Sequence, residues 1–277
     1  MKHWEFFFKI DGTKIFAQEW YDDNPKAVVG LIHGLGEHSG RYKHVGRKLS
    51  ENGFALMSFD LYGHGKSEGK RGHTLSYDLL YSSINEMLKK CREKYPGKPM
   101  FLYGHSLGGN ILLNYLLENK TEVSGAIVAS PWLKLAFEPP KLRLLLAKLV
   151  QKIYPTYTES TVYGPKDICR HPDFEKDYLA DPLVHDKITA RSFFLFSESG
   201  INALASTKKF KLPLLLMHGT DDKVTSHKAS REFAGNSNGH LKYKEWENLY
   251  HELHNEPEWE EVIQEVINWL ESNLEGS

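Results

Sequence analysis

The sequence predicts an α/β fold with a mostly parallel, doubly wound sheet and an inserted helical cap. Short apolar runs alternate with stretches that are apolar at helical spacing, and this alternation is typical of βαβ units. The alternation stops after residue 131 and resumes near residue 210, and the prolines of that segment include Pro139, Pro140 and Pro155. In a chain of 277 residues we therefore expect one core domain, residues 1–130 and 206–277, and a cap at residues 131–205.

The predicted strands begin with two β-rich runs, residues 4–10 and 13–20, which flank Asp11 and Gly12. An Asp-Gly pair favours a two-residue hairpin because both turn positions need a positive φ. Six apolar runs follow, at residues 27–32, 55–59, 100–103, 126–129, 212–217 and 241–246. The first five are nearly continuously apolar, as expected for parallel strands that are buried on both faces.

Between the strands, apolar residues recur at helical spacing in residues 77–95, 109–119 and 259–274. A further helix is predicted inside the cap, at residues 141–153, with one leucine-rich stripe and one lysine stripe. The stripes consist of Leu142, Leu145, Leu146, Leu149 and Ile153, and of Lys141, Lys148 and Lys152. A basic amphipathic helix can lie on a lipid surface, and it can equally pack over a pocket; the two roles are compatible.

Composition and charge exclude several classes of protein. The formal net charge is -1 without a basic region, so we expect no nucleic-acid partner. Glu5 and Lys9 interrupt the apolar residues at the N-terminus, which predicts neither a secretory signal nor a membrane span. Cys91 and Cys169 are expected to be free thiols. These features favour a cytoplasmic protein with peripheral membrane contact through the cap helix, and they specify no oligomeric state.

No metal or cofactor is predicted. His251 and His254 flank a glutamate as in a zinc motif, but they are three residues apart, whereas H-E-x-x-H places its histidines four apart. Residues 65–67 resemble the end of a P-loop, which would need a glycine at position 60, where the chain has Asp60.

A candidate nucleophile lies directly after the strand predicted at residues 100–103. Residues 104–108 read Gly-His-Ser-Leu-Gly, a G-x-S-x-G motif centred on Ser106 and followed by a predicted helix. In the α/β-hydrolase fold this motif forms a strained strand-to-helix turn that exposes the serine hydroxyl. The helix that follows directs free N–H groups toward developing negative charge. The motif in this position therefore predicts an α/β-hydrolase fold with Ser106 as the nucleophile.

The general base and the acid that orients it should follow the nucleophile, because α/β-hydrolases carry the order serine, acid, histidine. The strand at residues 212–217 ends in a polar turn with Asp221 and Asp222, and the residues alone leave both as candidates. His251 lies after the last strand and before the last helix, so it can reach the ends of the strands, and His254 is the alternative base.

An oxyanion hole needs two N–H donors directed at the oxygen of the tetrahedral intermediate. One should be the N–H of Leu107, which follows the nucleophile. The other should come from the loop at residues 33–42, directly after the first core strand, and we expect it to be the N–H of Leu35.

Several segments resemble the monoacylglycerol lipases, in the monoglyceride lipase and lysophospholipase group of serine hydrolases. They are HGLGEHSGRY (33–42), FDLYGHGKSEGKRG (59–72), GHSLGG (104–109), HGTDDKV (218–224) and HELHNE (251–256), of which the first two are specific to this group. The resemblance implies Asp222 as the acid and His251 as the base, with Leu35 and Leu107 as oxyanion donors. Leu107 stands where the family usually has methionine, but the reaction uses only its backbone N–H.

The resemblance also implies an activity and a lipid-like ester substrate. The reaction would be hydrolysis of a monoacylglycerol ester to fatty acid and glycerol through an acyl-enzyme, without a cofactor. The family places polar contacts to the glycerol at Glu37, Arg41 and His254; alternatively, Glu37 and Arg41 form an ion pair that only stiffens the loop. Other interpretations are a lysophospholipase or a general carboxylesterase. A non-catalytic binding protein is disfavoured because all three triad residues are present.

Overall fold

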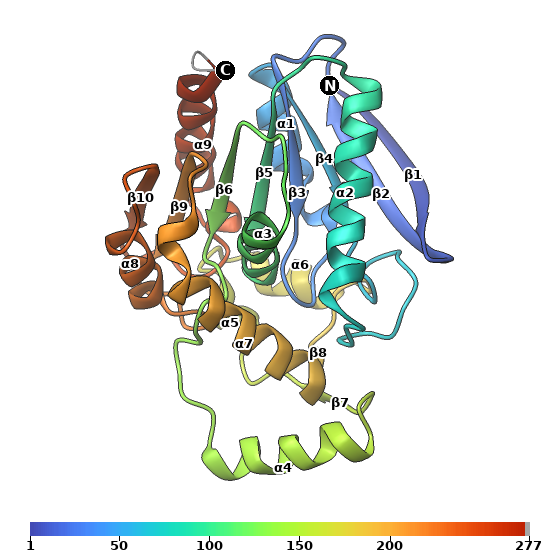
Figure 1. The fold of residues 1–277 in the computed structure, drawn as a ribbon, viewed down its shortest axis with the longest axis vertical. Helices are drawn as coiled ribbons and strands as arrows, with labels where there is room; N and C mark the ends of the chain where they lie inside the picture. Colours follow the sequence, from blue (N-terminus) through green and yellow to red (C-terminus); the bar gives the residue numbers. More distant parts are fainter. Residues whose placement is uncertain (275–277) are drawn as a thin grey trace.

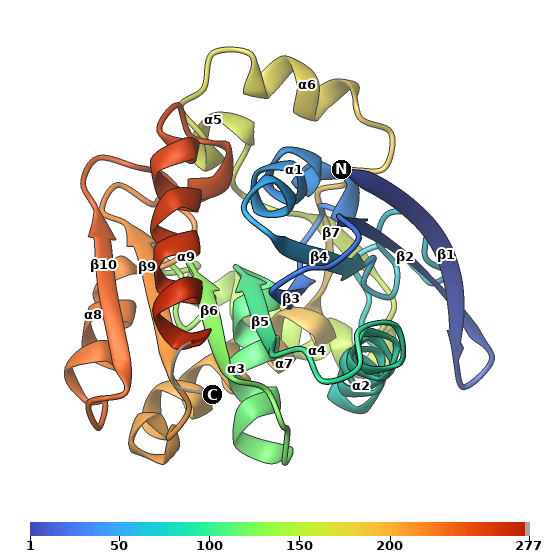
Figure 2. The ribbon, with the colours of Figure 1, turned by 90° about the horizontal axis from the view of Figure 1, so that it is seen from above.

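The computed structural model describes residues 1–274 and contains one sheet of eight strands with helices on both faces (Figure 1, Figure 2). The strand order is β1-β2-β4-β3-β5-β6-β9-β10. Neighbouring strands from β4 to β10 run parallel, whereas β1 and β2 run antiparallel to their neighbours. The predicted α/β-hydrolase sheet, mostly parallel and doubly wound, is confirmed.

The strands form close to the predicted positions. β1 (Lys2–Ile10) pairs with β2 (Thr13–Tyr21), and Asp11 and Gly12 turn the chain with φ of 47° and 84°. The parallel part consists of β3 (Ala27–Ile32), β4 (Phe54–Phe59), β5 (Met100–His105), β6 (Gly125–Ala129), β9 (Leu214–Gly219) and β10 (Leu241–Trp246). Every residue of β3, β4, β5, β6 and β9 is buried, and β10 is a partly exposed edge strand.

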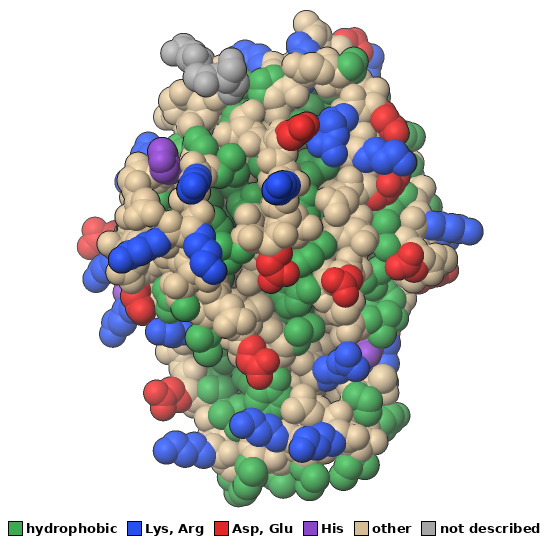
Figure 3. All heavy atoms as spheres, viewed as in Figure 1, with side chains coloured by type: hydrophobic (Ala, Val, Ile, Leu, Met, Phe, Trp, Pro, Cys, Tyr) green, Lys and Arg blue, Asp and Glu red, His purple; other side chains and the backbone are tan. Residues whose placement is uncertain are grey.

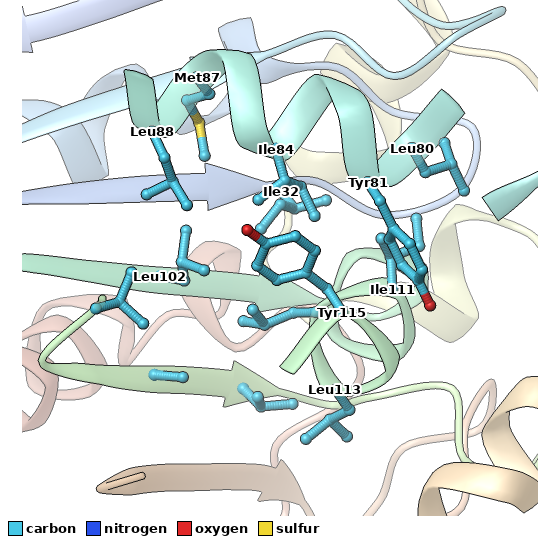
Figure 4. Packing of buried hydrophobic residues seen from close by; sticks show 14 of the residues in the cluster. Ile32, Leu80, Tyr81, Ile84, Met87, Leu88, Leu102, Ile111, Leu113 and Tyr115 are labelled. Atoms are coloured by element: carbon cyan, nitrogen blue, oxygen red, sulfur yellow. The ribbon is translucent and has the colours of Figure 1, made fainter. Parts of the chain in front are cut away.

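Helices cover both faces of this sheet (Figure 2). One face packs against α1 (Lys43–Glu51) and α9 (Trp259–Leu274). The other packs against α2 (Tyr77–Lys94), α3 (Leu107–Glu118) and α8 (His227–Gly235). Figure 4 shows part of this second layer, where side chains of α2 and α3 pack together over β3 and β5. Short 3-10 helices form at η1 (Ser39–Tyr42), η2 (Thr207–Lys209) and η3 (Leu253–Asn255).

The structure corrects the sequence prediction at several helices. α3 begins at Leu107, two residues before the predicted start, because the helix follows Ser106 without an intervening loop. The sequence pattern predicts neither α1 nor α8. The buried apolar side chains of α1 are Val45 and Leu49, and those of α8 are Ala229 and Phe233. Two such side chains are too few to produce a helical pattern in the sequence.

The segment between β6 and β9 contributes no strand to the eight-stranded sheet. It contains α4 (Lys141–Ile153), α5 (Pro165–Ile168), α6 (Phe174–Ala180), α7 (Ala190–Ala205) and the antiparallel pair β7 (Thr158–Ser160) and β8 (Lys187–Thr189). α4 buries none of its residues and lies at one end of the molecule, away from the sheet (Figure 1). α7 is an inner helix, because Phe196 and Ala203 join the same apolar cluster as α3.

Candidate active site

Ser106 lies at a sharp turn between β5 and α3. Its backbone has a positive φ of 54°, which is uncommon for a residue with a Cβ. A Cβ on Gly104 would lie 2.5 Å from the carbonyl oxygen of Gly108, and one on Gly108 would lie 2.0 Å from that of Ile32. Both glycines of the motif are therefore required, because any larger residue would collide with the neighbouring backbone.

Three side chains form a hydrogen-bonded chain where β5, β9 and β10 end. The Ser106 hydroxyl lies 2.8 Å from Nε2 of His251, and Nδ1 of His251 lies 2.7 Å from Oδ2 of Asp222. All three residues are buried. Asp221, the alternative acid, is exposed on the same turn, and its nearest side-chain partner is the hydroxyl of Thr220, at 3.4 Å. Of the two aspartates, the fold thus brings Asp222 to the histidine.

The charges in this chain favour proton transfer from Ser106 to His251. Burial alone would lower the pKa of His251, but the charge and the hydrogen bond of Asp222 raise it above its usual value. Burial alone would raise the pKa of Asp222, yet His251 and a hydrogen bond from His218 hold it far below its usual range. Asp222 is therefore ionised and His251 is a strengthened base, as activation of a serine hydroxyl requires.

Asp222 has further partners that the sequence analysis does not identify. Its Oδ1 accepts the backbone N–H groups of Val224 at 2.7 Å and of Thr225 at 2.9 Å. Its Oδ2 accepts the Thr225 hydroxyl at 2.9 Å and lies 3.0 Å from Nε2 of His218. The only sequence signal for His218 is its place in the H-G-T-D-D run, four residues before Asp222.

The loop at residues 33–42 passes directly beside Ser106. A Cβ on Gly34 would lie 3.1 Å from the Cβ of Ser106, and Leu35 lines the same cavity as Ser106. Leu107 is the first residue of α3, so its N–H has no partner within the helix. The two residues predicted as oxyanion donors therefore lie on the two segments next to the Ser106 side chain.

A buried ion-pair network joins this loop to the loop that carries His251. Oε1 of Glu37 accepts the N–H of Gly34 at 2.5 Å. Arg41 donates to Oε2 of Glu37 at 3.2 Å, and both of its Nη atoms donate to Glu252, at 2.7 and 2.8 Å. Glu252 directly follows His251 in the chain. Arg41 thus connects the segment beside Ser106 to the segment that carries His251.

The two carboxylates of this network differ in their affinity for a proton. Burial and the charge of Glu252 raise the pKa of Glu37 to about 7, against the opposing effect of Arg41. Burial would also raise the pKa of Glu252, but the charge and hydrogen bonds of Arg41 lower it. Arg41 therefore stabilises the charged form of Glu252, with which it makes two hydrogen bonds, more strongly than that of Glu37, with which it makes one.

Of the three residues that the family resemblance places at the glycerol, Glu37 and Arg41 belong to the loop at residues 33–42, and His254 packs against it. Glu37 and Arg41 are engaged in the network, and His254 is fully buried with its ring stacked on Tyr42 at a centroid distance of 4.4 Å. Within residues 1–274, the lining of the cavity beside Ser106 includes none of the three. The geometry brings Glu37 and Arg41 together as the ion pair of the alternative interpretation, and it favours that interpretation over a direct contact with the glycerol.

A cavity of about 330 Å³ opens beside Ser106. Its walls are mostly apolar, and they come from the core and from the segment between β6 and β9. They include Leu35, Leu135, Phe137, Leu144, Val150, Ile188 and Phe193. Such a space suits a flexible apolar chain whose polar end reaches the nucleophile.

α4 contributes to this cavity on one side and faces solvent on the other. Leu144 and Val150 line the cavity, whereas Leu142 and Ile153 of the predicted leucine stripe are 69% and 75% exposed. Figure 3 shows apolar side chains gathered at this end of the molecule, next to lysine and arginine side chains. Within the part of the chain that the structure describes, no helix is long and apolar enough to cross a membrane.

Comparison with known proteins identifies relatives over most of the chain. The model of the family described as serine aminopeptidase S33 matches residues 23–258. An uncharacterised abhydrolase-domain protein of Dictyostelium discoideum is 36% identical over 91% of this chain, and the match covers 27% of that longer protein. A monoacylglycerol lipase of Mycolicibacterium smegmatis is 29% identical over 97% of this chain and 96% of its own. The phospholipase YtpA of Bacillus subtilis is 31% identical over 88% of this chain and 95% of its own.

A solved structure shows similarity to the same kind of protein. The crystal structure of a monoacylglycerol lipase from Paleococcus ferrophilus matches with a TM-score of 0.84 at 34% identity, and the match covers 94% of this chain and 99% of that chain. The resemblance therefore extends over nearly the whole of both chains.

Proposed function

The chain belongs to the family described as serine aminopeptidase S33, and from this premise we infer that it is a serine ester hydrolase that cleaves monoacylglycerols to fatty acid and glycerol. One observation carries this function: the chain of Ser106, His251 and Asp222 lies at an apolar cavity of about 330 Å³. The similarity to monoacylglycerol lipases supports the substrate class. Residues 131–205 act as the cap over the acyl chain.

In the first half of the reaction the enzyme is acylated. Oγ of Ser106 attacks the ester carbonyl carbon while Nε2 of His251 takes the hydroxyl proton. The backbone N–H groups of Leu35 and Leu107 bind the oxyanion of the tetrahedral intermediate. The bond to the glycerol oxygen then breaks, and His251 gives its proton to that oxygen, so that glycerol leaves and the acyl group stays on Ser106.

In the second half, water replaces glycerol. His251 takes a proton from the water, the resulting hydroxide attacks the acyl carbon, and the same N–H groups bind the second oxyanion. The Ser106 oxygen leaves with the proton from His251, which frees the fatty acid. Asp222 stays ionised throughout and holds His251 with Nδ1 protonated, because its pKa lies far below that of the imidazole.

The cap connects this chemistry to a lipid surface. The exposed leucine stripe of α4, flanked by Lys141, Lys148 and Lys152, contacts the membrane as an interfacial helix, while the inner face of α4 lines the cavity. A monoacylglycerol can then pass from the bilayer to Ser106 with its acyl chain along apolar walls. Peripheral membrane contact is therefore part of the proposed function.

A lysophospholipase is the second candidate, because a phospholipase is among the relatives at a similar identity. A substrate panel separates the two. Monoacylglycerols, lysophospholipids and p-nitrophenyl esters of the same fatty acid are hydrolysed with the purified protein, and Ser106→Ala serves as the blank. We expect kcat/KM to be highest for monoacylglycerols. A higher value for lysophospholipids would transfer the function to the second candidate, and equal values for all three would leave a general carboxylesterase.

A further inference from the structure

We propose that His218 is a positioning residue for this reaction: it holds the Asp222 carboxylate in the orientation in which that carboxylate binds His251. The inference rests on the proposed function, since it concerns the same triad. His218 lies near the end of β9 and is fully buried, so its backbone is fixed by the sheet rather than by a loop. Its Nε2 lies 3.0 Å from Oδ2 of Asp222, the oxygen that also binds His251 at 2.7 Å.

The hydrogen bonds of His218 determine its tautomer. The Asp222 carboxylate can only accept, so Nε2 of His218 is the protonated nitrogen and donates. Nδ1 of His218 lies 2.7 Å from Oγ of Ser230 on α8. A neutral imidazole with its proton on Nε2 has an acceptor at Nδ1, and therefore Ser230 donates to it. The chain thus runs from Ser230 through His218 to the carboxylate.

A second serine–histidine pair consequently lies on the far side of the catalytic acid. In both pairs a serine hydroxyl donates to a histidine, and the histidine donates to the same oxygen of Asp222. A rotation of the carboxylate would break both histidine hydrogen bonds at once, so the His218 bond opposes any rotation that would release His251. Because the donor also withdraws electron density from Oδ2, it lowers the basicity of the carboxylate toward the His251 proton.

Several polar and titratable groups surround the imidazoles of His218 and His251, and they decide which variants can test the proposal. Asp222 faces His218 from the turn after β9, and His251 faces that carboxylate from the loop after β10. From α8, Ser230 binds the His218 ring and His227 packs near it, with ring centroids 6.5 Å apart. On its other side, His251 packs against His105 at 4.9 Å, the charges of the adjacent Glu252 and of Glu37 act on it, and it also interacts with the His254 ring.

Two amide variants of His218 distinguish the effect of its hydrogen bond to Asp222 from the effect of its packing. In His218→Asn the amide occupies the place of Nδ1, so it keeps the contact with Ser230 and loses the donor to Asp222. In His218→Gln the amide nitrogen reaches the place of Nε2 and keeps that donor. The matched control is His227→Asn, which changes a neighbouring imidazole that does not contact the triad. The measurements are kcat and KM for a p-nitrophenyl ester and the pH dependence of kcat/KM.

For His218→Asn we expect kcat to fall about tenfold to a hundredfold, the cost known for losing a hydrogen-bond partner that orients a metal-binding side chain, with KM changed by less than about twofold. The acidic limb of kcat/KM should move to higher pH, because a carboxylate with one donor fewer holds the His251 proton more strongly. His218→Gln should recover most of the lost rate, and His227→Asn should match the wild type. Ser230→Ala provides the test if the asparagine variant does not fold, with a smaller loss of kcat and the same direction of pH shift.

The positioning role would be contradicted if the asparagine and glutamine variants had equal kcat and equal pH midpoints. A failure of the proposed function looks different. In that case the wild-type protein itself would hydrolyse none of the esters, whereas an active wild type with two identical amide variants would refute only the role of His218.

Discussion

At the scale of single residues, Asp222 is the group on which the geometry of the site converges. Its two oxygens accept from two backbone N–H groups, one hydroxyl and two imidazoles. Since these donors stabilise the charged form, the carboxylate is ionised at every pH at which His251 can act as a base. The tautomer of His251 therefore depends on a carboxylate that stays ionised over this pH range.

The paired aspartates give a direct test at this scale. Asp222→Asn replaces an acceptor by an amide that can donate to Nδ1 of His251, which stabilises the wrong tautomer, and we expect kcat to fall by about 10⁴. Asp221→Asn should remain within about tenfold of the wild type, because Asp221 is exposed and asparagine replaces aspartate readily in turns. Steady-state kinetics on a p-nitrophenyl ester measure both, and the reverse ranking would place the acid one residue earlier.

At the scale of elements, the loop after β3 and the loop after β10 act as one unit. Arg41 of the first loop binds Glu252 of the second with both Nη atoms, and Glu37 holds the backbone of Gly34. The position of Gly34 relative to Ser106 and the position of His251 are thus linked through the guanidinium of Arg41.

Removing the guanidinium tests this linkage. Arg41→Met leaves Glu37 and Glu252 buried without a cation, and we expect a loss of about 3–5 kcal/mol in the free energy of unfolding. Urea denaturation measures this loss, and Arg47→Ala, which removes an exposed ion pair with Glu51, serves as the control that stays close to wild type. Monoacylglycerol and p-nitrophenyl ester hydrolysis should decrease together. A selective decrease for monoacylglycerol would instead indicate that Arg41 contacts the glycerol.

The outer face of α4 can be tested separately from its inner face. Leu145 and Leu149 are 66% and 56% exposed, so Leu145→Ser with Leu149→Ser should weaken membrane binding at least about tenfold without closing the cavity. Leu179→Ser on α6 is the matched control, because Leu179 is 69% exposed on another element. Flotation with anionic vesicles at low salt measures binding. A wild-type protein that stays in the unbound fraction would leave α4 with its role over the cavity alone.

The strands and helices that the sequence predicts are those whose apolar pattern lies within the segment itself. The continuous apolar runs predict β3 to β6 and β9 because these strands are buried on both faces, and α9 is predicted at its observed bounds by its periodic apolar residues. The partners of the catalytic residues carry no such signal. Arg41 and Glu252 are 211 positions apart, and Ser230 lies on α8, a helix with too few buried apolar residues to be predicted. Such contacts exist only once the sheet has assembled.

At the scale of the whole molecule, the parallel sheet brings distant residues to one edge. Ser106, Asp222 and His251 follow the ends of β5, β9 and β10, and the loop with Leu35 follows β3. Because the carboxyl ends of parallel strands meet at the same edge, side chains 145 positions apart come within 2.8 Å. The segment between β6 and β9 supplies walls of the cavity beside that edge. The fold therefore places the hydrogen-bonded chain next to an apolar space that can hold the substrate.

The most direct test of the proposed reaction is covalent labelling of the whole protein with an organophosphonate, followed by peptide mass spectrometry. We expect a single adduct on Ser106, no labelling of Ser106→Ala, and labelling of His251→Ala that is slower by several orders of magnitude, because the serine then lacks its base. An adduct on any other residue, or undiminished labelling of Ser106→Ala, would contradict the assignment of Ser106 as the nucleophile.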